Sequence, residues 1–292
     1  MINIIWQTQK GPHTTNFYDF VRKVLFRDID CVDYFDELRY ETILDNSVII
    51  YSCFFSYPPI ELVEYLKKFK AKGYKFGLYH LSNEYQLPER IEYDHYLDAE
   101  FVLRQYYDDR ITCDNTYTLP IGFLAGYHNV NGEKNLSEQR DIVYSFIGQV
   151  KSDRVQMLNS LNGIEPKFLH ITKDWADPNG LTPKDVIEIY KKTLFIPCPM
   201  GYCHIETLRL YEALEWGCIP IIKKYNGEDY YLKIFGKHPI PVINEWSEII
   251  ETMERIRNGD IDKLMLEINS WYSEFNDTVR DNVGEIVCRI SY

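Results

Sequence analysis

Arg209 and Glu212 are the two residues whose types and spacing point most directly to chemistry. Residues three apart share one face of a helix, so a guanidinium and a carboxylate would lie side by side there. A guanidinium binds phosphate oxygens through paired hydrogen bonds, and a carboxylate accepts hydrogen bonds from the ribose in nucleotide sites. The pair therefore predicts a nucleotide site; the alternative is an ion pair on a helix surface or between helices.

Residues 193–222 are expected to form the elements that position this pair. Apolar residues at 194–196 predict a buried strand, and the prolines after them predict a loop. A helix is expected over about residues 205–216, ending at Gly217, and a second buried strand over 218–222. The N-terminus of such a helix favours an anion, because its unpaired N–H groups and its dipole point the same way. The loop and the start of the helix therefore add the candidate binding residues Gly201, Tyr202 and Thr207.

A second group of candidates follows the strand expected at residues 142–147. Gly148 begins a turn that opens a helix, and Lys151 and Arg154 are expected in the first turn of that helix. Cations at a helix N-terminus cost ~0.3–1 kcal/mol, so their presence favours a bound diphosphate; a solvated lysine and a peripheral ion pair are the alternative. The loop after the next expected strand adds Thr172, as a candidate for contacting the base of the nucleotide.

The first half of the chain has the alternation of strands and helices that is typical of a parallel sheet. Strands are expected at residues 2–6, 47–52 and 76–81, with helices over about 17–25 and 58–73 between them. This βαβαβ order predicts a doubly wound sheet with right-handed crossovers. Sites in such sheets lie at the carboxyl ends of the strands.

The segment around the Arg–Glu pair resembles that of the exostosin-like glycosyltransferases, glycosyltransferase family 47, including members similar to the ribitol xylosyltransferases. The shared residues are Pro199-Met-Gly201, Arg209-Leu-Tyr-Glu212-Ala213 and Gly217-Cys-Ile-Pro220, within a likeness that covers roughly residues 140–225. The resemblance implies the two-domain GT-B fold, a nucleotide donor that is commonly a UDP-sugar, and inversion at the anomeric carbon. Because the first half of the chain matches only loosely, the resemblance implies neither the acceptor nor the sugar.

An inverting transferase needs a base that takes the proton from the acceptor hydroxyl. Residues 80–84 are polar directly after an expected strand and are similar to a His-x-Ser-Asp-Glu-type stretch of exostosin-like relatives, with Asn83 where an aspartate is frequent. Glu84 is the first candidate for the base; its alternative is a helix cap or a surface carboxylate. Arg104, at the end of a strand expected over 100–105, is a candidate for binding donor phosphate or acceptor. The reserve candidates for the base are Asp98 and His13.

The chain is long enough for two domains, each with its own core. A turn-rich stretch places the expected hinge near residues 127–139. We therefore expect an acceptor domain over residues 1–135 and a donor domain over 136–275, both Rossmann-like α/β domains that face a cleft. Two amphipathic helices are expected between residues 261 and 290, and residues 276–292 are expected to form a C-terminal helix that crosses back to the first domain.

The composition disfavours several classes of partner. The 292 residues include 32 Lys and Arg against 44 Asp and Glu, a net charge of −12, which disfavours nucleic acid and anionic membrane. Seven cysteines without a Cys-x-x-Cys pair suggest neither a disulfide framework nor a zinc knuckle. The N-terminus lacks the features of a signal peptide, and no window holds the ~20 apolar residues of a membrane span. A cytoplasmic enzyme is expected, or else a trimmed lumenal catalytic domain.

The patterns and the resemblance together predict an inverting glycosyltransferase that moves xylose, glucuronate or galactose from a UDP-sugar to a glycan hydroxyl. Lys151, Arg154 and Arg209 would neutralise the departing diphosphate, so neither a metal nor a cofactor is expected. A GDP-sugar fucosyltransferase and a catalytically silent nucleotide- or glycan-binding protein are the alternatives. A Rossmann dehydrogenase is disfavoured, because no Gly-x-Gly-x-x-Gly fingerprint follows the strands expected at 2–6 and 142–147.

Overall fold

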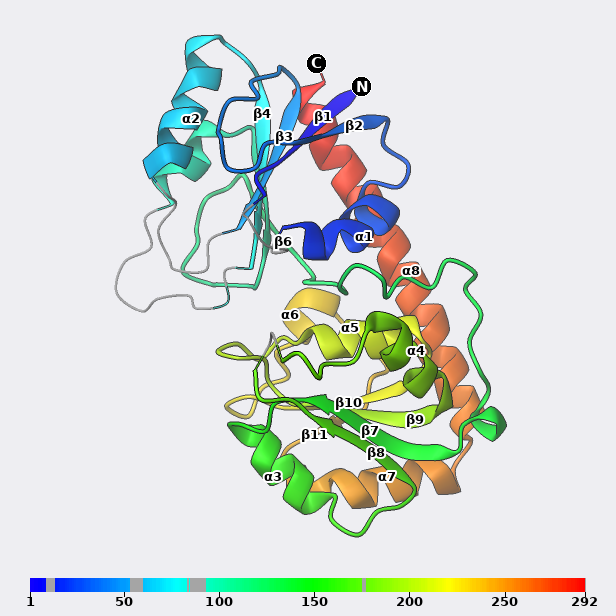
Figure 1. The fold of residues 1–292 in the computed structure, drawn as a ribbon. Helices are drawn as coiled ribbons and strands as arrows, with labels where there is room; N and C mark the ends of the chain where they lie inside the picture. The colour runs from blue at the N-terminus through cyan, green and yellow to red at the C-terminus, as the bar shows by residue number, and fades with distance from the viewer. Residues whose placement is uncertain (9–13, 53–59, 83, 85–92, 175–176, 292) are drawn as a thin grey trace. The chain divides into compact units, whose positions relative to one another are not determined.

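The chain forms two compact units, each built around one parallel sheet. The first unit comprises Met1–Ile121 together with Asn276–Tyr292, and the second comprises Gly122–Phe275. Residues 122–135, which the sequence placed in the first domain, therefore pack with the second unit. Figure 1 shows the computed structural model, which describes residues 1–8, 14–52, 60–82, 84, 93–174 and 177–291.

Hydrogen bonds to Glu215 and Trp216 explain why the segment after Ile121 packs in the second unit. One carboxylate oxygen of Glu215 accepts from the backbone N–H of Asn129 at 2.7 Å and lies 2.9 Å from Nδ1 of His128. Trp216 donates its indole N–H to the carbonyl of Tyr127 at 2.8 Å. The turn-rich composition of this segment indicates only that it is irregular, so it did not reveal which unit the segment contacts.

A six-stranded parallel sheet forms the centre of the first unit, in the order β2-β1-β3-β4-β5-β6. The inner strands form where apolar runs predicted them, and both of their faces are buried. The edge strands β2 and β6 were not expected, because they are partly exposed and mix polar with apolar residues. The strands are β1 (Ile2–Trp6), β2 (Cys31–Phe35), β3 (Ser47–Ser52), β4 (Phe76–Leu81), β5 (Phe101–Gln105) and β6 (Thr116–Leu119).

Two helical segments connect the first strands of this sheet. The helix expected over 17–25 forms as a 3₁₀ turn (Thr15–Phe17), the short α1 (Tyr18–Phe20) and a π-helical turn (Val21–Leu25). The second, α2 (Ile60–Ala71), buries its apolar stripe in the core and is followed by Gly73, whose φ of +68° suits a helix end. The start that the sequence predicted for α2, at Pro58, lies outside the described residues.

A five-stranded parallel sheet forms the centre of the second unit, in the order β11-β10-β9-β7-β8. The expected strands form within two residues of their predicted bounds, and the two-residue β11 was not expected. The strands are β7 (Ile142–Gly148), β8 (Lys167–Ile171), β9 (Thr193–Cys198), β10 (Ile219–Lys223) and β11 (Val242–Ile243). The helices are α3 (Asp153–Ser160), α4 (Pro183–Lys192), α5 (Leu208–Glu215), α6 (Leu232–Phe235) and α7 (Ile249–Asn258).

The last part of the chain forms one helix of 27 residues, α8 (Ile261–Val287), where the sequence predicted two. It is the long helix at the end of the chain in Figure 1. The two predicted apolar stripes continue one another without a proline or glycine near residue 276, so nothing breaks the helix there. The division between the units falls inside α8, between Phe275 and Asn276. In the described part of the chain, no helix has both the length and the apolar character needed to span a bilayer.

The buried guanidinium of Arg140 joins the carboxyl-terminal ends of α4 and α5. It donates to the carbonyl oxygens of Tyr190 at 2.8 Å, Thr193 at 2.7 Å and Trp216 at 3.0 Å. The last carbonyls of a helix have no partner within the helix, and a positive charge at this end also interacts favourably with the helix dipole. Lys134 acts in the same way on α5, because its ammonium donates to the carbonyl of Leu214 at 3.1 Å.

A buried group of histidine and tyrosine side chains lies near the carboxyl ends of β3 and β4. The Tyr51 hydroxyl lies 2.8 Å from Nε2 of His95, and the Tyr96 hydroxyl lies 2.5 Å from Nδ1 of His80. Burial lowers the pKa of His95 to about 4, and burial together with the Arg104 charge lowers the pKa of His80 well below its usual value. Both imidazoles are therefore neutral at pH 7.

The first unit is expected to lose stability on acidification, and His95→Gln is expected to reduce that loss. Below pH 6.5 this histidine is mostly protonated in the unfolded chain, whereas the buried His95 of the folded protein stays neutral down to about pH 4. The free energy of unfolding should therefore fall as pH falls, by about 2 kcal/mol between pH 7 and 5 for this residue. Urea unfolding of the wild type and the variant at both pH values measures the difference; equal losses in the two proteins would contradict the assignment.

Candidate functional site

The predicted binding residues of the second unit gather at the carboxyl edge of its sheet. β7 ends at Gly148, which pairs with Ile171 at the end of β8. Directly after β8, Thr172 donates its backbone N–H to the carbonyl of Gly148 at 3.2 Å. The loop between β9 and α5 leaves the same edge, because β9 runs parallel to β7. Residues from three separate stretches of sequence thus meet at one edge of the sheet.

Arg209 is held against the end of β7. It lies in the first turn of α5, which begins after Thr207, and only 9% of its surface is exposed. Its Nη2 donates to the carbonyl of Ile147 at 2.7 Å, and its guanidinium carbon lies 4.6 Å from the ring centroid of Phe146. Its Nη1 is buried and has no hydrogen-bond partner among the described residues. The guanidinium is therefore fixed in place with one nitrogen left to bind something else.

Arg154 is the second buried guanidinium of this edge. It lies in the first turn of α3, as expected, and is 8% exposed. Its Nη2 donates to the carbonyl of Met200 at 3.0 Å, and its Nη1 donates to that of Gln149 at 3.1 Å. Arg154 thus ties the loop after β7 to the loop after β9 through backbone oxygens.

Both guanidinium groups converge on Gly148. A Cβ added there would lie 3.0 Å from Nη2 of Arg209 and 3.9 Å from Nη1 of Arg154. The backbone of Gly148 also has a φ of +140°, which favours glycine. The close approach of Arg209 and the backbone conformation are thus two separate reasons for a residue without a side chain here. Two fixed cations around a residue without a side chain form a cradle that suits an anion with several oxygens.

Glu212 lies one turn beyond Arg209 and is also buried, with 8% of its surface exposed. Burial raises the pKa of its carboxyl to about 7, an effect that the Arg209 charge partly opposes. The nearby Glu212 carboxyl also contributes to the raised pKa of Tyr127 and of Tyr190, after burial. The predicted Arg–Glu pair therefore exists, but it lies inside the unit beside the strand ends and not on an open helix face.

Lys151 and Tyr202 add a cation and an aromatic surface to the same edge. The Lys151 ammonium lies 3.8 Å from the ring centroid of Tyr202, whose side chain is 53% exposed. Lys151 was expected in the first turn of α3, but α3 begins at Asp153, because Ser152 has a φ of +52° that interrupts the helix. Gly201 donates its N–H to the carbonyl of His204 at 2.7 Å, which folds the loop back on itself.

Glu206 is a buried residue of this site that the sequence analysis did not identify. It is 1% exposed and directly precedes Thr207. Its carboxylate accepts hydrogen bonds from the hydroxyls of Tyr211 and Tyr230. These contacts hold the loop before α5, and the helix begins at Leu208 and not near 205 as predicted. The tyrosines are five and twenty-four residues away in sequence, so no local pattern could have revealed the contact.

The candidate base residues of the first unit lie at different places. Glu84 follows β4 by three residues and is partly buried at the carboxyl end of that strand. Asp98 precedes β5 and pairs with Lys70 at 2.5 Å, near the end of α2. It therefore lies at the amino edge of the sheet, where sites in such sheets do not form, which removes the reason for its choice. The reserve candidate His13, and Asn83 beside Glu84, lie outside the described residues.

Arg104, the candidate at the end of β5, is almost fully buried in the first unit. It is 1% exposed, and its guanidinium carbon lies 5.3 Å from the ring centroid of Tyr93. Its Nη1 and Nη2 have no hydrogen-bond partner among the described residues.

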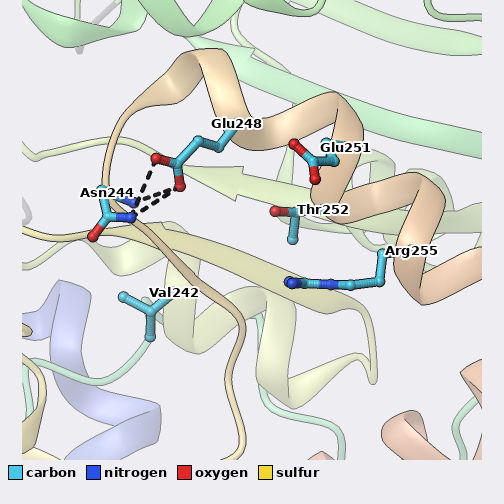
Figure 2. A pocket seen from close by; sticks show the side chains of 6 residues that line it. All are labelled: Val242, Asn244, Glu248, Glu251, Thr252 and Arg255. Carbon is cyan, nitrogen blue, oxygen red and sulfur yellow. Dashed lines mark hydrogen bonds between the residues drawn. The ribbon is translucent and has the colours of Figure 1, made fainter.

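A hollow on the surface of the second unit offers a different environment from the arginine cradle. Glu248 and Glu251 supply two carboxylates to it against the single guanidinium of Arg255, so its charge disfavours a diphosphate. The carboxylate of Glu248 accepts from the backbone N–H of Asn244 at 3.0 Å. Within the described residues, no three His, Cys, Asp or Glu side chains group as metal ligands would. Figure 2 shows the lining residues of the hollow: Val242, Asn244, Glu248, Glu251, Thr252 and Arg255.

Several solved structures are similar to this chain. A glycosyltransferase from Rickettsia africae ESF-5 matches with a TM-score of 0.53 and 12% identity, over 99% of this chain and 98% of that one. An Anabaena protein, Alr3699/HepE, solved in complex with UDP, matches with a TM-score of 0.48 and 10% identity, over 98% and 99% of the two chains. An α1,3-fucosyltransferase matches with a TM-score of 0.47 and 12% identity, over 92% and 80%.

The two Rossmann-like units, each with a parallel sheet, are those of the GT-B glycosyltransferase fold, as predicted. No curated protein sequence matches the chain significantly. A family model does match, and it is described as the RXYLT1 C-terminal domain. Fold and family together support a glycosyltransferase. Because that match covers residues 126–290, more than half of the chain, this protein belongs to the RXYLT1 C-terminal domain family.

Proposed function

We propose that this protein transfers a sugar from a nucleotide-diphosphate donor, held at the carboxyl edge of the second sheet, to a hydroxyl group of a glycan. The observation that carries the proposal is the convergence of Arg154 and Arg209 on Gly148. Both guanidiniums are buried and donate to backbone carbonyls, and Nη1 of Arg209 has no hydrogen-bond partner among the described residues. A diphosphate has the charge and the number of oxygens to bind both at once.

The departing diphosphate explains why the cations are fixed. As the bond between the sugar and the β-phosphate breaks, its electron pair moves to the phosphate oxygen, and negative charge grows there. Arg154 and Arg209 stabilise this charge without having to reorganise, and Lys151 and the N-terminus of α5 add to their effect. With these groups in place, we propose that the transfer needs neither a metal ion nor a cofactor.

The remaining donor contacts follow from the same edge. Glu212 is proposed to accept hydrogen bonds from the ribose, and Tyr202 and Thr172 are proposed to lie against the nucleoside. Gly201 and Thr207 lie in the loop that leads into α5 and are proposed to lie beside the phosphate groups of the donor. We propose uridine as the base because of the resemblance to the exostosin-like enzymes, and xylose, glucuronate or galactose as the sugar.

Glu84 is proposed as the base in the first unit. Its carboxylate would take the proton of the acceptor hydroxyl while that oxygen bonds to the anomeric carbon and the diphosphate leaves from the opposite side. A direct displacement of this kind inverts the anomeric configuration.

Two experiments test this proposal. The first is calorimetric titration with UDP and GDP, with and without magnesium. The second is a set of transfer assays with UDP-sugars and glycan acceptors. Micromolar UDP binding without metal, and transfer with inversion, are expected. Preference for GDP would point to a GDP-sugar enzyme such as a fucosyltransferase. UDP binding without transfer to any acceptor would indicate a catalytically silent binding protein.

Arg209→Ala should weaken UDP binding by roughly 10- to 100-fold, because a hydrogen bond to a charged group contributes about 1.5–3 kcal/mol. Arg255→Ala is the matched control, since it removes an exposed guanidinium of the same unit from the hollow in Figure 2. It should leave the UDP dissociation constant unchanged. Equal affinity of Arg209→Ala and the wild type, measured by calorimetry, would reject the cradle as the donor site.

Glu212→Gln is expected to remove a pH dependence of stability. The raised pKa of about 7 means that, above pH 4.5, the native carboxyl keeps a proton that the unfolded chain releases. The free energy of unfolding should thus fall as pH rises, by about 2 kcal/mol between pH 5 and 8 for this residue. Urea unfolding of both proteins should show the variant gaining relative to the wild type over this range. A constant difference between the two would show that Glu212 titrates as an exposed carboxyl does.

A further inference from the structure

Gln105 joins the ends of three neighbouring strands through one side chain. It is the last residue of β5 and is completely buried. Its amide oxygen accepts the backbone N–H of Ser82 at 2.9 Å, and its amide nitrogen donates to the carbonyl of Ile121 at 3.0 Å. Ser82 directly follows β4 and Ile121 lies just after β6, on the two sides of β5. The side chain thus crosses the carboxyl edge of the first sheet.

The bond to Ser82 fixes the direction in which the chain leaves β4. Ser82 has a φ of +58°, in the left-handed region, which is strained for a residue with a side chain. A buried hydrogen bond at its N–H stabilises this conformation. Glu84, the candidate base, is only two residues farther along, so a change of backbone angle at Ser82 would move its carboxylate.

The bond to Ile121 fixes the point where the chain leaves the first unit. Ile121 is the last residue of this unit before the second begins, and Gly122 follows it with a φ of +68°. The amide group of Gln105 therefore fixes the backbone at two places. One is Ser82, two residues before Glu84, and the other is Ile121, where the chain leaves the first unit.

The amide of Gln105 suits both bonds at once. The site needs an acceptor for the N–H of Ser82 and a donor for the carbonyl of Ile121, and an amide provides one of each. A glutamate would place a carboxylate oxygen against the carbonyl of Ile121. A methionine would fill the space but would remove both hydrogen bonds.

We propose that Gln105 is the positioning residue that sets the orientation of Glu84 for sugar transfer. This inference rests on the proposed function, in which Glu84 takes the proton of the acceptor hydroxyl. Gln105 itself touches no substrate and acts through the backbone of Ser82. All proposed donor contacts lie in the second unit, so Gln105 should affect the transfer step and not the affinity for the donor.

The test compares Gln105→Met in two backgrounds. In the wild type, kcat should fall about tenfold or more, since small displacements of a catalytic group have effects of this size. The UDP dissociation constant and the donor KM should stay within about twofold. In a Glu84→Gln background, where no base remains to be positioned, Gln105→Met should change kcat by less than about twofold.

Asn115→Leu is the matched control from the same unit. The amide of Asn115 also bridges two carbonyls, those of Tyr96 at 2.8 Å and Ala99 at 2.9 Å, but at the amino edge of the sheet. Asn115→Leu should lower the melting temperature, as Gln105→Met should, but it should leave kcat unchanged.

Three results would overturn the inference while the proposed function stands. These are an equal loss of kcat in both backgrounds, a loss of kcat in Asn115→Leu as large as that in Gln105→Met, and unchanged kcat in Gln105→Met. If the unaltered protein binds UDP but transfers no sugar, the proposed function fails and this inference fails with it.

Discussion

The geometry of the candidate donor site depends on how the far end of α5 is held. α5 has only eight residues, so a small tilt at one end moves the side chains at the other. Arg140 and Lys134 bind carbonyls at this end, and Glu215 accepts a hydrogen bond from the backbone of Asn129. A helix end that leaves these carbonyls unpaired in a buried setting would lose about 1–3 kcal/mol for each of them. These contacts lie at the opposite end of the helix from Arg209, yet they determine where its guanidinium meets Gly148.

The two buried arginines of the site are held in place by neutral backbone groups. Arg154 and Arg209 donate to backbone carbonyls, which satisfy N–H groups without cancelling charge. In a chain with a net charge of −12, such an arrangement is needed if a diphosphate is to bind locally. Glu212 is the acidic residue whose charge acts on Arg209, and its raised pKa leaves it partly protonated near neutral pH, which weakens its competition with the ligand.

The second unit could be predicted in more detail than the first, for a physical reason. Its strand, turn and helix follow one another within about 30 residues, so Gly148, Arg154 and Arg209 could be placed from local signals. Contacts between distant segments gave no such signal. The bonds from Tyr211 and Tyr230 to Glu206, and those from Asn129 and Lys134 to the end of α5, are known only from the three-dimensional structure. The edge strands β2 and β6 were missed because partial exposure removes the apolar run.

In the first unit, the direction of the strands distinguishes between two candidate base residues that the sequence could not distinguish. Glu84 and Asp98 are both carboxylates near buried strands, so their distance from a strand in the sequence does not show which is the better candidate. Because all six strands are parallel, a residue that follows a strand lies at one edge of the sheet and a residue that precedes a strand lies at the other. Glu84 follows β4, beside the edge that Gln105 crosses, whereas Asp98 precedes β5 and is paired with Lys70. Strand polarity therefore favours Glu84 over Asp98 as the proposed base, and it places the amides of Gln105 and Asn115 at opposite edges of the sheet.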